Sequence, residues 1–360
     1  MKKLSKLLSV LLALAMVFAL ASCGSGSTSS NSGSGSTPSS ADNSAASSAG
    51  DSSSSADASG TAADGETYTV GICQLVQHDA LDAATQGFKD ALTEKLGDAV
   101  TFEEQNASGD TANCSTIIDG FLSDGVDLIL ANATAPLQAA AAATSEIPVL
   151  GTSVTDYATA LEIDNWTGTV GNNISGTSDL APLDQQADML HEMFPDAKNV
   201  GLLYCSGEPN SSYQCQVIEG YLRDYGYDVK SYAFTDTNDV TSVAQTAADN
   251  SDVIYIPTDN TAAANTEAIA NVVLPAKIPV IAGEEGIAKG CGVATLTISY
   301  YDLGYTTGEM AYEILANGAD ISTMPVEFAP EVTAKYNPTN CEALGITPPE
   351  GYEAIEMEEG

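Results

Sequence analysis

The sequence predicts an α/β protein of two doubly wound, Rossmann-like lobes with a hinge and a cleft between the lobes. From residue 67 onward, short apolar runs alternate with segments of helical period, which is the pattern of repeated βα units around a parallel sheet. The alternation loosens over residues 151–176 and then restarts as a second, similar series. No G-x-G-x-x-G follows the first predicted strand, so the pattern does not favour dinucleotide binding.

The first series predicts one sheet with its covering helices. Residues 79–96 place Leu81, Ala84, Phe88 and Leu92 on one stripe, which is the period of an amphipathic helix. The other expected elements are strands at 68–75, 100–104, 127–130 and 147–150 and helices at 111–122 and 135–143.

The second series predicts the other sheet and the return of the chain. Its expected helices are 179–194, 211–225, 240–249, 261–273, 303–317 and 339–344, and its expected strands are 199–204, 228–234, 252–257, 279–282, 293–297 and 326–336. We therefore expect lobe I to comprise residues 66–172 with about 283–317, and lobe II residues 173–282 with about 318–350.

Composition excludes several kinds of partner and site. The formal charge is −38, so long-range repulsion opposes approach to nucleic acid or anionic lipid heads. His78 and His191 are the two histidines, which leaves little material for a histidine metal site or a Ser-His-Asp triad. We expect no nucleic-acid partner, no metal, no cofactor and no enzymatic activity.

The first 65 residues read as a targeting segment and a tether. Lys2, Lys3 and Lys6 precede an apolar run over residues 7–20, which is short for a membrane span. The run ends at Leu-Ala-Ser-Cys23, which resembles the bacterial lipobox, whose cysteine is lipidated. Residues 24–65 are rich in Ser, Gly and Ala without an aromatic, so we expect a disordered tether and a membrane-anchored, extracytoplasmic protein.

The other cysteines give no metal-binding pattern. They contain no C-x-x-C pair, so zinc and iron–sulfur readings are weak. Export permits disulfides, but free thiols are the simpler expectation. These cysteines are Cys73, Cys114, Cys205, Cys215, Cys291 and Cys341.

Polar side chains follow the predicted strands in both lobes. Ligands in parallel α/β sheets bind outside the carboxyl ends of the strands, so these side chains are the expected inventory of a small-ligand site. For several of them a turn or a helix cap is the competing interpretation. The candidates are Gln77, His78, Asn132, Thr134, Thr177, Ser178, Asp179, Glu208, Asn210, Asp259, Asn260 and Glu284.

These candidates fit a zwitterion. We expect Thr177 and Ser178 to open the helix over 179–194, where unpaired amides attract an anion. Arg223 lies within a predicted helix, so a ligand carboxylate would be held by amides and hydroxyls. Asp259 or Glu284 would then face a ligand ammonium, and an amino acid satisfies both ends.

Several motifs point to one family. The matching runs are His78–Ala84, Asn106–Asp110, Ala131–Thr134, Gly171–Asp179, Glu208–Ser211, Asp259–Asn260, Tyr300–Gly304 and Leu344–Ile346. In these motifs the chain resembles the bacterial ABC-transporter substrate-binding lipoproteins of the tryptophan/tyrosine-binding type. The likeness runs from about residue 68 to 350. One departure is Gln77-His78-Asp79, where family members often carry Glu-His-Pro.

The resemblance implies a fold and a role. The fold would be that of the type I periplasmic binding proteins. The role would be capture of an aromatic amino acid, as a monomer, for a membrane permease driven by an ATPase. A sugar or nucleoside receptor, a ligand sensor for a signalling receptor and a secreted hydrolase using His78 are the alternatives, although the folded body has no G-x-S-x-G elbow.

Overall fold

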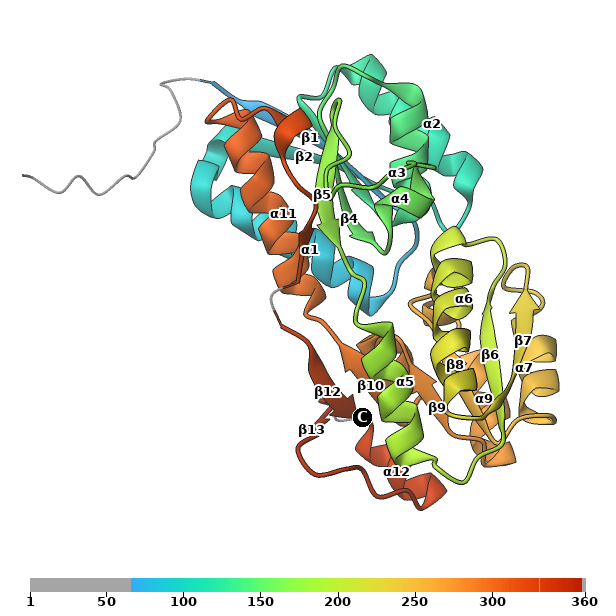
Figure 1. Cartoon of the computed structure of the whole chain (residues 1–360). Coiled ribbons are helices and arrows are strands. Elements are labelled where there is room, and N and C mark those ends of the chain that lie inside the picture. The colour runs from blue at the N-terminus through green and yellow to red at the C-terminus, as the bar shows by residue number, and fades with distance from the viewer. Residues whose placement is uncertain (1–65, 330, 358–360) are drawn as a thin grey trace, which may run out of the picture. The chain divides into compact units, whose positions relative to one another are not determined.

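The computed structural model describes residues 66–329 and 331–357, and these form two α/β lobes (Figure 1). In the order of the strands across each sheet, the first sheet is β11-β5-β4-β3-β1-β2 and the second is β13-β12-β10-β9-β8-β6-β7. The five-strand core of each sheet therefore has the same doubly wound order, with the first strand of the lobe between the second and the third.

Lobe I is built from the first βα series and from a segment that returns late in the chain. Its strands are β1 (Tyr68–Gln74), β2 (Val100–Asn106), β3 (Leu128–Asn132), β4 (Val149–Val154), β5 (Ile174–Ser178) and β11 (Glu327–Phe328). Its helices are α1 (Asp79–Leu96), α2 (Thr111–Asp124), α3 (Thr134–Ala143), α4 (Tyr157–Ala160) and α11 (Tyr300–Leu315), with 3-10 turns at Gly97–Ala99 and Ile321–Thr323. All its strand pairs are parallel.

Lobe II contains the second series and the C-terminal elements. Its strands are β6 (Asn199–Cys205), β7 (Asp228–Phe234), β8 (Val253–Ile256), β9 (Val280–Ala282), β10 (Ala294–Thr297), β12 (Thr333–Tyr336) and β13 (Glu353–Ala354). Its helices are α5 (Leu183–Met193), α6 (Pro209–Asp224), α7 (Val240–Ala248), α8 (Asn260–Ala263), α9 (Thr266–Ala276), α10 (Glu285–Gly290) and α12 (Pro338–Leu344). The pairing of β10 with β12 is antiparallel.

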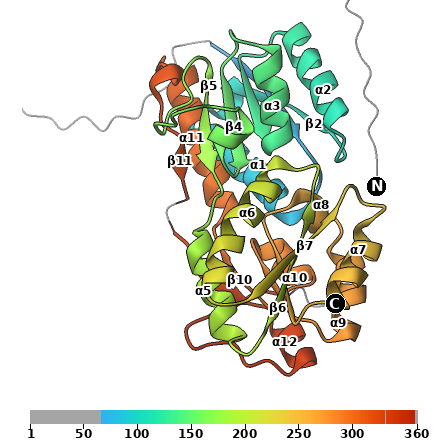
Figure 2. The same ribbon diagram turned by 45° about the vertical axis from the view of Figure 1, so that its right-hand side comes forward.

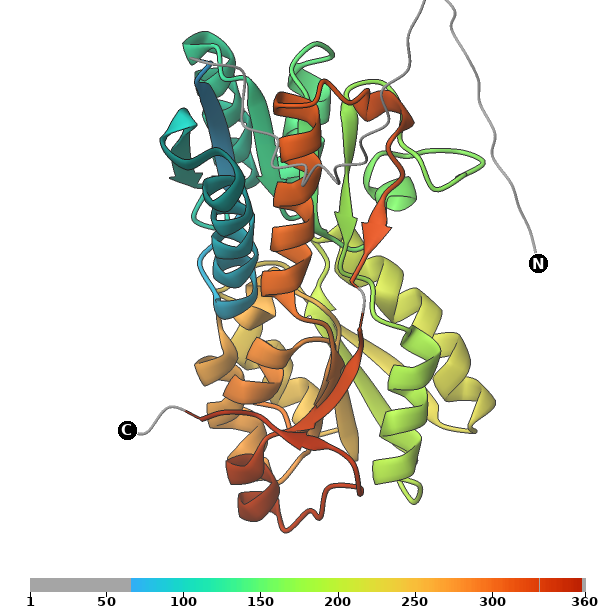
Figure 3. The same cartoon turned by 90° about the vertical axis from the view of Figure 1, so that its left-hand side faces the viewer.

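Helices cover both faces of each sheet, as a parallel sheet requires. In lobe I, α1 and α11 lie side by side on one face (Figure 3), and α2 and α3 pack on the other. In lobe II, α5 and α6 cover one face, whereas α7 and α9 cover the other (Figure 2). The central strands β3 and β8 are fully buried and rich in Val, Ile and Leu, whereas β2 and β7 at the sheet edges are partly exposed.

Close packing ties the returning helix α11 to lobe I. A Cβ at Gly304 would collide with the carbonyl oxygen of Ala84 on α1, so the two helix backbones approach more closely than any larger residue allows. The N-terminus of α11, where the chain has just left lobe II, is thereby held against α1.

The chain crosses between the lobes after β5, after β10 and after β11. Our predicted boundaries were wrong here. We expected lobe II to start at residue 173, but Ile174–Ser178 forms β5 of the first sheet. We expected residues 283–317 in lobe I, but β10 pairs with β9 in lobe II. Of residues 318–350, the part that forms β11 lies in lobe I.

The error at β5 has a physical cause. The strand is Ile-Ser-Gly-Thr-Ser, so it lacks the apolar pattern that marks a buried strand. Hydrogen bonds of its hydroxyl groups and close approach hold it instead: a Cβ at Gly176 would collide with the backbone of Gly151 in β4. A hydroxyl-rich run of this kind resembles a helix cap when only the sequence is known.

Two further properties of the described residues bear on the expectations. In residues 66–329 and 331–357, no helix is both long and apolar enough to cross a membrane. The six cysteines of this part of the chain are all free and buried. The predicted signal segment, Cys23 and the tether lie outside the described residues.

Candidate ligand-binding site between the lobes

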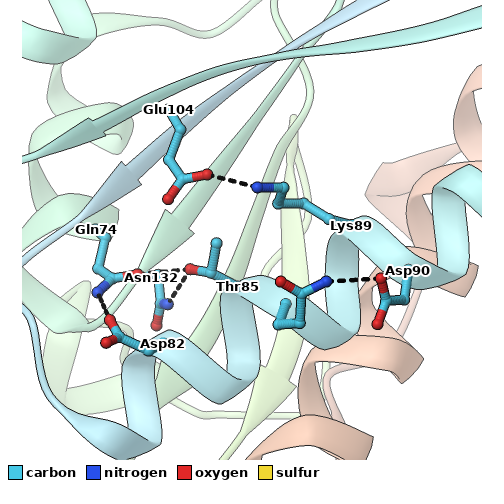
Figure 4. A network of polar contacts seen from close by, with 8 residues as sticks. Gln74, Asp82, Thr85, Lys89, Asp90, Glu104 and Asn132 are labelled. Carbon is cyan, nitrogen blue, oxygen red and sulfur yellow. Dashed lines mark hydrogen bonds and ion pairs between the residues drawn. The ribbon is translucent and has the colours of Figure 1, made fainter.

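A buried polar network fixes the start of helix α1, where the site begins (Figure 4). Gln74 at the end of β1 donates to Asp82 at 2.6 Å and accepts from Thr85 at 2.7 Å. Asn132 at the end of β3 donates to Thr85 at 2.9 Å and to the carbonyl of Leu81 at 2.8 Å. Asn132 thus joins α1 to the sheet inside lobe I.

His78 is the N-cap residue of α1, and its ring is not used for capping. The backbone is extended there, and the ring reaches lobe II, where Nε2 lies 3.2 Å from Oδ1 of Asn260. This hydrogen bond crosses directly between the lobes. Burial lowers the pKa of His78, while the Asn260 contact and nearby carboxylates oppose that shift, so the ring is neutral near pH 7.

The His78–Asn260 contact borders a cavity between the lobes. Its lining comes in equal parts from the two lobes. The lobe I residues are His78, Leu81, Ser153, Thr155, Asp179 and Tyr300, and the lobe II residues are Asn210, Thr258, Asp259, Asn260, Ala263 and Glu284. In this arrangement the cavity has a free volume of about 10 Å³, which is room for roughly one water molecule.

Three buried polar atoms of this lining lack a hydrogen-bond partner. They are Nδ1 of His78, Oγ of Ser153 and Oδ1 of Asp179. Buried polar groups in folded proteins are normally paired, and an unpaired one costs about 1–3 kcal/mol. These three atoms therefore have free hydrogen-bonding capacity beside the cavity.

Asp179 lies just after β5 and is buried. Its Oδ2 accepts a hydrogen bond of 2.8 Å from the hydroxyl of Tyr300 on α11, whereas Oδ1 is free. Burial raises the pKa of Asp179, although the Tyr300 bond lowers it. A cation that meets Oδ1 favours the charged carboxylate.

The lobe II carboxylates at the same place are saturated by their own lobe. Asp259 accepts from the backbone amides of Cys205 at 2.6 Å and Ala262 at 2.7 Å. Glu284 accepts from the amides of Gly286 at 2.6 Å and Ile287 at 2.5 Å, which caps α10. Our expectation that Asp259 or Glu284 faces a ligand ammonium therefore finds no free oxygen there.

Burial raises the pKa of both carboxyl groups. For Glu284 the pKa rises to about 7, against the effect of its two amide bonds. For Asp259 burial acts together with the charge of nearby Glu208. Both groups are thus structural carboxyls held in an apolar setting.

Glu208 does not line the cavity but orders the residue that does. Its Oε2 accepts from the side-chain amide of Asn260 at 2.8 Å, and its Oε1 accepts from the amide and hydroxyl of Thr261, each at 2.8 Å. Glu208 therefore fixes which end of the Asn260 amide faces His78.

The predicted anion site at residues 175–179 is wrong. Ile174–Ser178 is a strand, and the next helix starts at Leu183 after Pro182, so no helix N-terminus lies at Thr177 or Ser178. Thr177 Oγ1 lies 2.8 Å from the hydroxyl of Thr307, and Ser178 donates to the carbonyl of Thr155 at 2.8 Å. Both side chains hold lobe I together.

Other predicted site residues also lie outside the cavity lining. Gln77 is exposed, while Asn132 and Thr134 are buried within lobe I. The predicted residues that the structure brings together at the cavity are His78, Asp179, Asn210, Asp259, Asn260 and Glu284. Their contact with a ligand remains a prediction.

The polar residues that the sequence analysis missed are Ser153, Thr155, Thr258 and Tyr300. Ser153 and Thr155 were not predicted as site residues because the predicted strand ended at residue 150, whereas β4 continues to Val154. Tyr300 is part of the family motif Tyr300–Gly304, and its position shortly after the end of β10 is the signal that could have identified it.

A second, more open hollow lies beside this cavity and shares Glu284 and Tyr300 with it. Both lysines of its lining are already in ion pairs: Lys335 with Glu285 at 2.7 Å, and Lys289 with Asp79 at 3.4 Å across the lobes. We place the candidate site in the smaller cavity because the unpaired atoms line it. No group of three or more metal-ligating side chains in the described part of the chain could hold a metal ion.

Comparison with known proteins agrees with this architecture. The family model described as ABC transporter substrate binding protein matches residues 69–356. A curated relative, the tyrosine-binding protein of Clostridioides difficile (strain R20291), is 34% identical over 280 residues, which cover 77% of this chain and 81% of the relative.

Solved structures show the same fold. A domain from Streptococcus pneumonia in complex with L-Trp has 29% identity and a TM-score of 0.77. The ligand-free, open structure of a substrate binding protein with adhesive properties from Clostridium difficile has 36% identity and a TM-score of 0.62. Each comparison covers 81% of this chain and 100% of the other. The structural similarity is thus greater to the L-Trp complex, despite its lower sequence identity.

The predicted fold class, two parallel-sheet lobes of the type I periplasmic binding protein kind, is confirmed by these neighbours. The resemblance drawn from the motifs is confirmed as well, since the family model spans nearly all of the described residues. The chain therefore belongs to the family of ABC transporter substrate binding proteins.

Proposed function

We propose that this protein captures an aromatic amino acid in the cavity between its lobes and delivers it to an ABC permease with its ATPase. The observation that carries the proposal is the set of three unpaired buried atoms, on His78, Ser153 and Asp179, at one interlobe cavity. The tyrosine-binding relative and the neighbour with bound L-Trp support an aromatic amino acid as the ligand class.

Asp179 is the group that meets the ligand ammonium in this proposal. Among the carboxylates that line the cavity, Asp179 alone has an oxygen without a partner. No lysine or arginine is part of the lining, so no positive group of the protein competes with the ammonium. The Ser153 hydroxyl can donate to the ligand carboxylate at the same cavity.

The unpaired atoms also give a reason for ligand-driven closure. With the lobes together and no ligand, three polar atoms stay buried without partners, which disfavours that state. With the lobes apart, water reaches them. This cost exists only in the closed form, and a ligand that pairs with the three atoms removes it. Ligand binding therefore shifts the population toward the closed form. The free volume of about 10 Å³ is too small for an amino acid, so the ligand enters while the lobes are apart, and the lobes close around it less tightly than in the ligand-free arrangement described above.

The N-terminal part completes the proposal. We infer that residues 1–23 direct export, that Cys23 carries a lipid anchor, and that residues 24–65 tether the monomeric body outside the membrane, where it meets the permease. The charged n-region, the apolar run and the terminal Leu-Ala-Ser-Cys support this assignment.

The alternatives find less support at the cavity. Sugar sites often use stacked aromatics, but Trp166 packs against the lobe I core, and among Phe, Tyr and Trp the lining contains Tyr300 alone. A hydrolase would need an activated nucleophile. Ser153 and His78 both line the cavity, yet Ser153 Oγ and His78 Nδ1 are each without a partner, so they do not form a nucleophile–base pair.

A ligand panel measured by thermal unfolding tests the proposal. The purified protein is melted with each of the twenty amino acids, with sugars and nucleosides as controls. We expect stabilisation by aromatic amino acids, about 2.7 kcal/mol at a ligand concentration one hundred times Kd. Asp179→Asn removes the shift, whereas the exposed Gln77→Ala keeps it. Stabilisation by sugars or nucleosides alone would contradict the proposal.

A further inference from the structure

The orientation of the Asn260 amide determines which nitrogen of His78 carries the proton. Glu208 Oε2 accepts from the backbone amide of Asn260 at 3.0 Å and from its Nδ2 at 2.8 Å. Reversing the amide would place two acceptor oxygens against each other. Asn260 Oδ1 therefore faces His78 Nε2 at 3.2 Å, and because Oδ1 can only accept, Nε2 is the donor.

The other ring nitrogen is then a bare acceptor. A neutral imidazole that carries its proton on Nε2 presents a lone pair at Nδ1. This atom is buried and has no partner in the protein, and the residue lines the cavity. Nδ1 therefore needs a donor, which within the cavity is either a water molecule or a group of the ligand that displaces it.

A second acceptor competes for ligand donors from the same lobe. Asp179 Oδ1 is also unpaired, and as a carboxylate it attracts a ligand ammonium more strongly than a neutral ring nitrogen does. With the ammonium at Asp179, the acceptor on His78 is left for a different N–H or O–H of the ligand. On an aromatic amino acid that group is the phenol of tyrosine or the indole N–H of tryptophan.

We propose that His78 is a specificity-determining residue whose Nδ1 accepts a hydrogen bond from the side-chain donor of the ligand. The site then selects amino acids with a donor on the ring, tyrosine and tryptophan, over phenylalanine. A site with a buried polar group rejects an analogue that leaves the group unpaired. This inference rests on the proposed function, since it assumes amino-acid binding in the cavity.

The first test changes the ligand and leaves the protein intact. Isothermal titration of the full chain compares tyrosine, phenylalanine and O-methyltyrosine, which keeps the phenolic oxygen and adds a methyl group in place of the O–H donor. We expect tyrosine to bind about 10- to 100-fold more tightly than either analogue. Equal affinity for tyrosine and phenylalanine would overturn the role of His78 and leave the proposed function standing. Absence of binding by any aromatic amino acid would instead refute the proposed function.

The second test assigns the selectivity to His78. In the His78→Leu variant we expect the affinity for tyrosine to exceed that for phenylalanine by less than about 3-fold, mainly because tyrosine binds more weakly. Gln77→Ala, in the same loop but exposed, keeps the wild-type ratio. If His78 instead shares the ammonium with Asp179, His78→Leu weakens all aromatic ligands equally and the proposal fails. Thermal unfolding of each variant confirms that it folds, and the ligand series decides the matter if His78→Leu does not.

Discussion

The two lobes present similar residues to the cavity, but they treat them differently. Lobe II contributes Asp259, Asn260 and Glu284, whose side chains are bonded within lobe II or to His78. Lobe I contributes His78, Ser153 and Asp179, each with an unpaired buried atom. These lobe II side chains therefore already have hydrogen-bond partners, whereas those of lobe I can still form hydrogen bonds. In the proposed function, the number of partners that a polar residue already has, more than its type, therefore assigns ligand recognition to lobe I.

This difference predicts that replacing a lobe II carboxylate lowers stability, whereas replacing the lobe I carboxylate lowers ligand affinity. Asp259→Ala removes the acceptor of two buried amides, those of Cys205 and Ala262. We expect the free energy of unfolding to fall by about 2–4 kcal/mol, with part of the loss offset by relief of repulsion with Glu208. Urea unfolding of the ligand-free protein measures it.

Asp179→Asn in lobe I is the matched comparison. It leaves the stability of the ligand-free protein nearly unchanged, because Asp179 Oδ1 has no partner to lose, and it weakens aromatic ligands by about 100-fold. If Asp259→Ala reduced affinity as much as Asp179→Asn, both lobes would contact the ammonium and the comparison would be wrong.

The regular helices and strands of the fold could be predicted from the sequence. Helix 79–96 and strand 228–234 have the bounds that were predicted, because strong apolar periodicity marks them. The strand Ile174–Ser178 and the helix Glu285–Gly290 were missed, because hydroxyl packing and a side-chain cap hold them. The predicted helix 261–273 is two helices, with a break between Ala263 and Thr266.

For the site, the sequence could indicate where polar residues gather but not which atoms remain free. In the sequence Asp179 and Glu208 look equivalent, since each carboxylate lies at or just before the start of a predicted helix. In the fold, Glu208 is surrounded by donors of Asn210, Asn260 and Thr261, whereas one oxygen of Asp179 has none. That distinction arises from tertiary contacts between segments far apart in the chain, so no local pattern could reveal it.

A smaller effect concerns pH and a saturated lobe II carboxyl. Burial raises the pKa of Glu284 from 4.5 to about 7. Between these values the folded protein holds a proton that the unfolded chain releases, so this residue makes stability fall as pH rises from about 4.5 to about 7. The contribution is at most about 3 kcal/mol.

The Glu284→Gln variant lacks the fall in stability with rising pH that the Glu284 carboxyl causes. We expect the variant to lose less unfolding free energy between pH 5 and pH 8 than the wild type, as measured by urea unfolding at both pH values. The variant begins from a lower stability, because glutamine has one acceptor oxygen for the two amides that Glu284 serves. An unchanged pH slope would mean that Glu284 is ionised throughout.

The smallest expected effect separates strain from function at Ser153 in lobe I. Its φ is 54°, in the left-handed region, and its hydroxyl is unpaired, so the residue is costly in the ligand-free protein. Ser153→Gly relieves the backbone strain, partly against the greater freedom of glycine in the unfolded chain. We expect a gain of about 0.5–1 kcal/mol in stability and a loss of about 3- to 10-fold in ligand affinity. Glu162→Gly, at φ 52° on the exposed surface of the same lobe, provides the control: it relieves similar strain but leaves affinity as it was. A Ser153→Gly protein that binds as tightly as the wild type would show that this hydroxyl is spare, and the free capacity of lobe I would then reduce to His78 and Asp179.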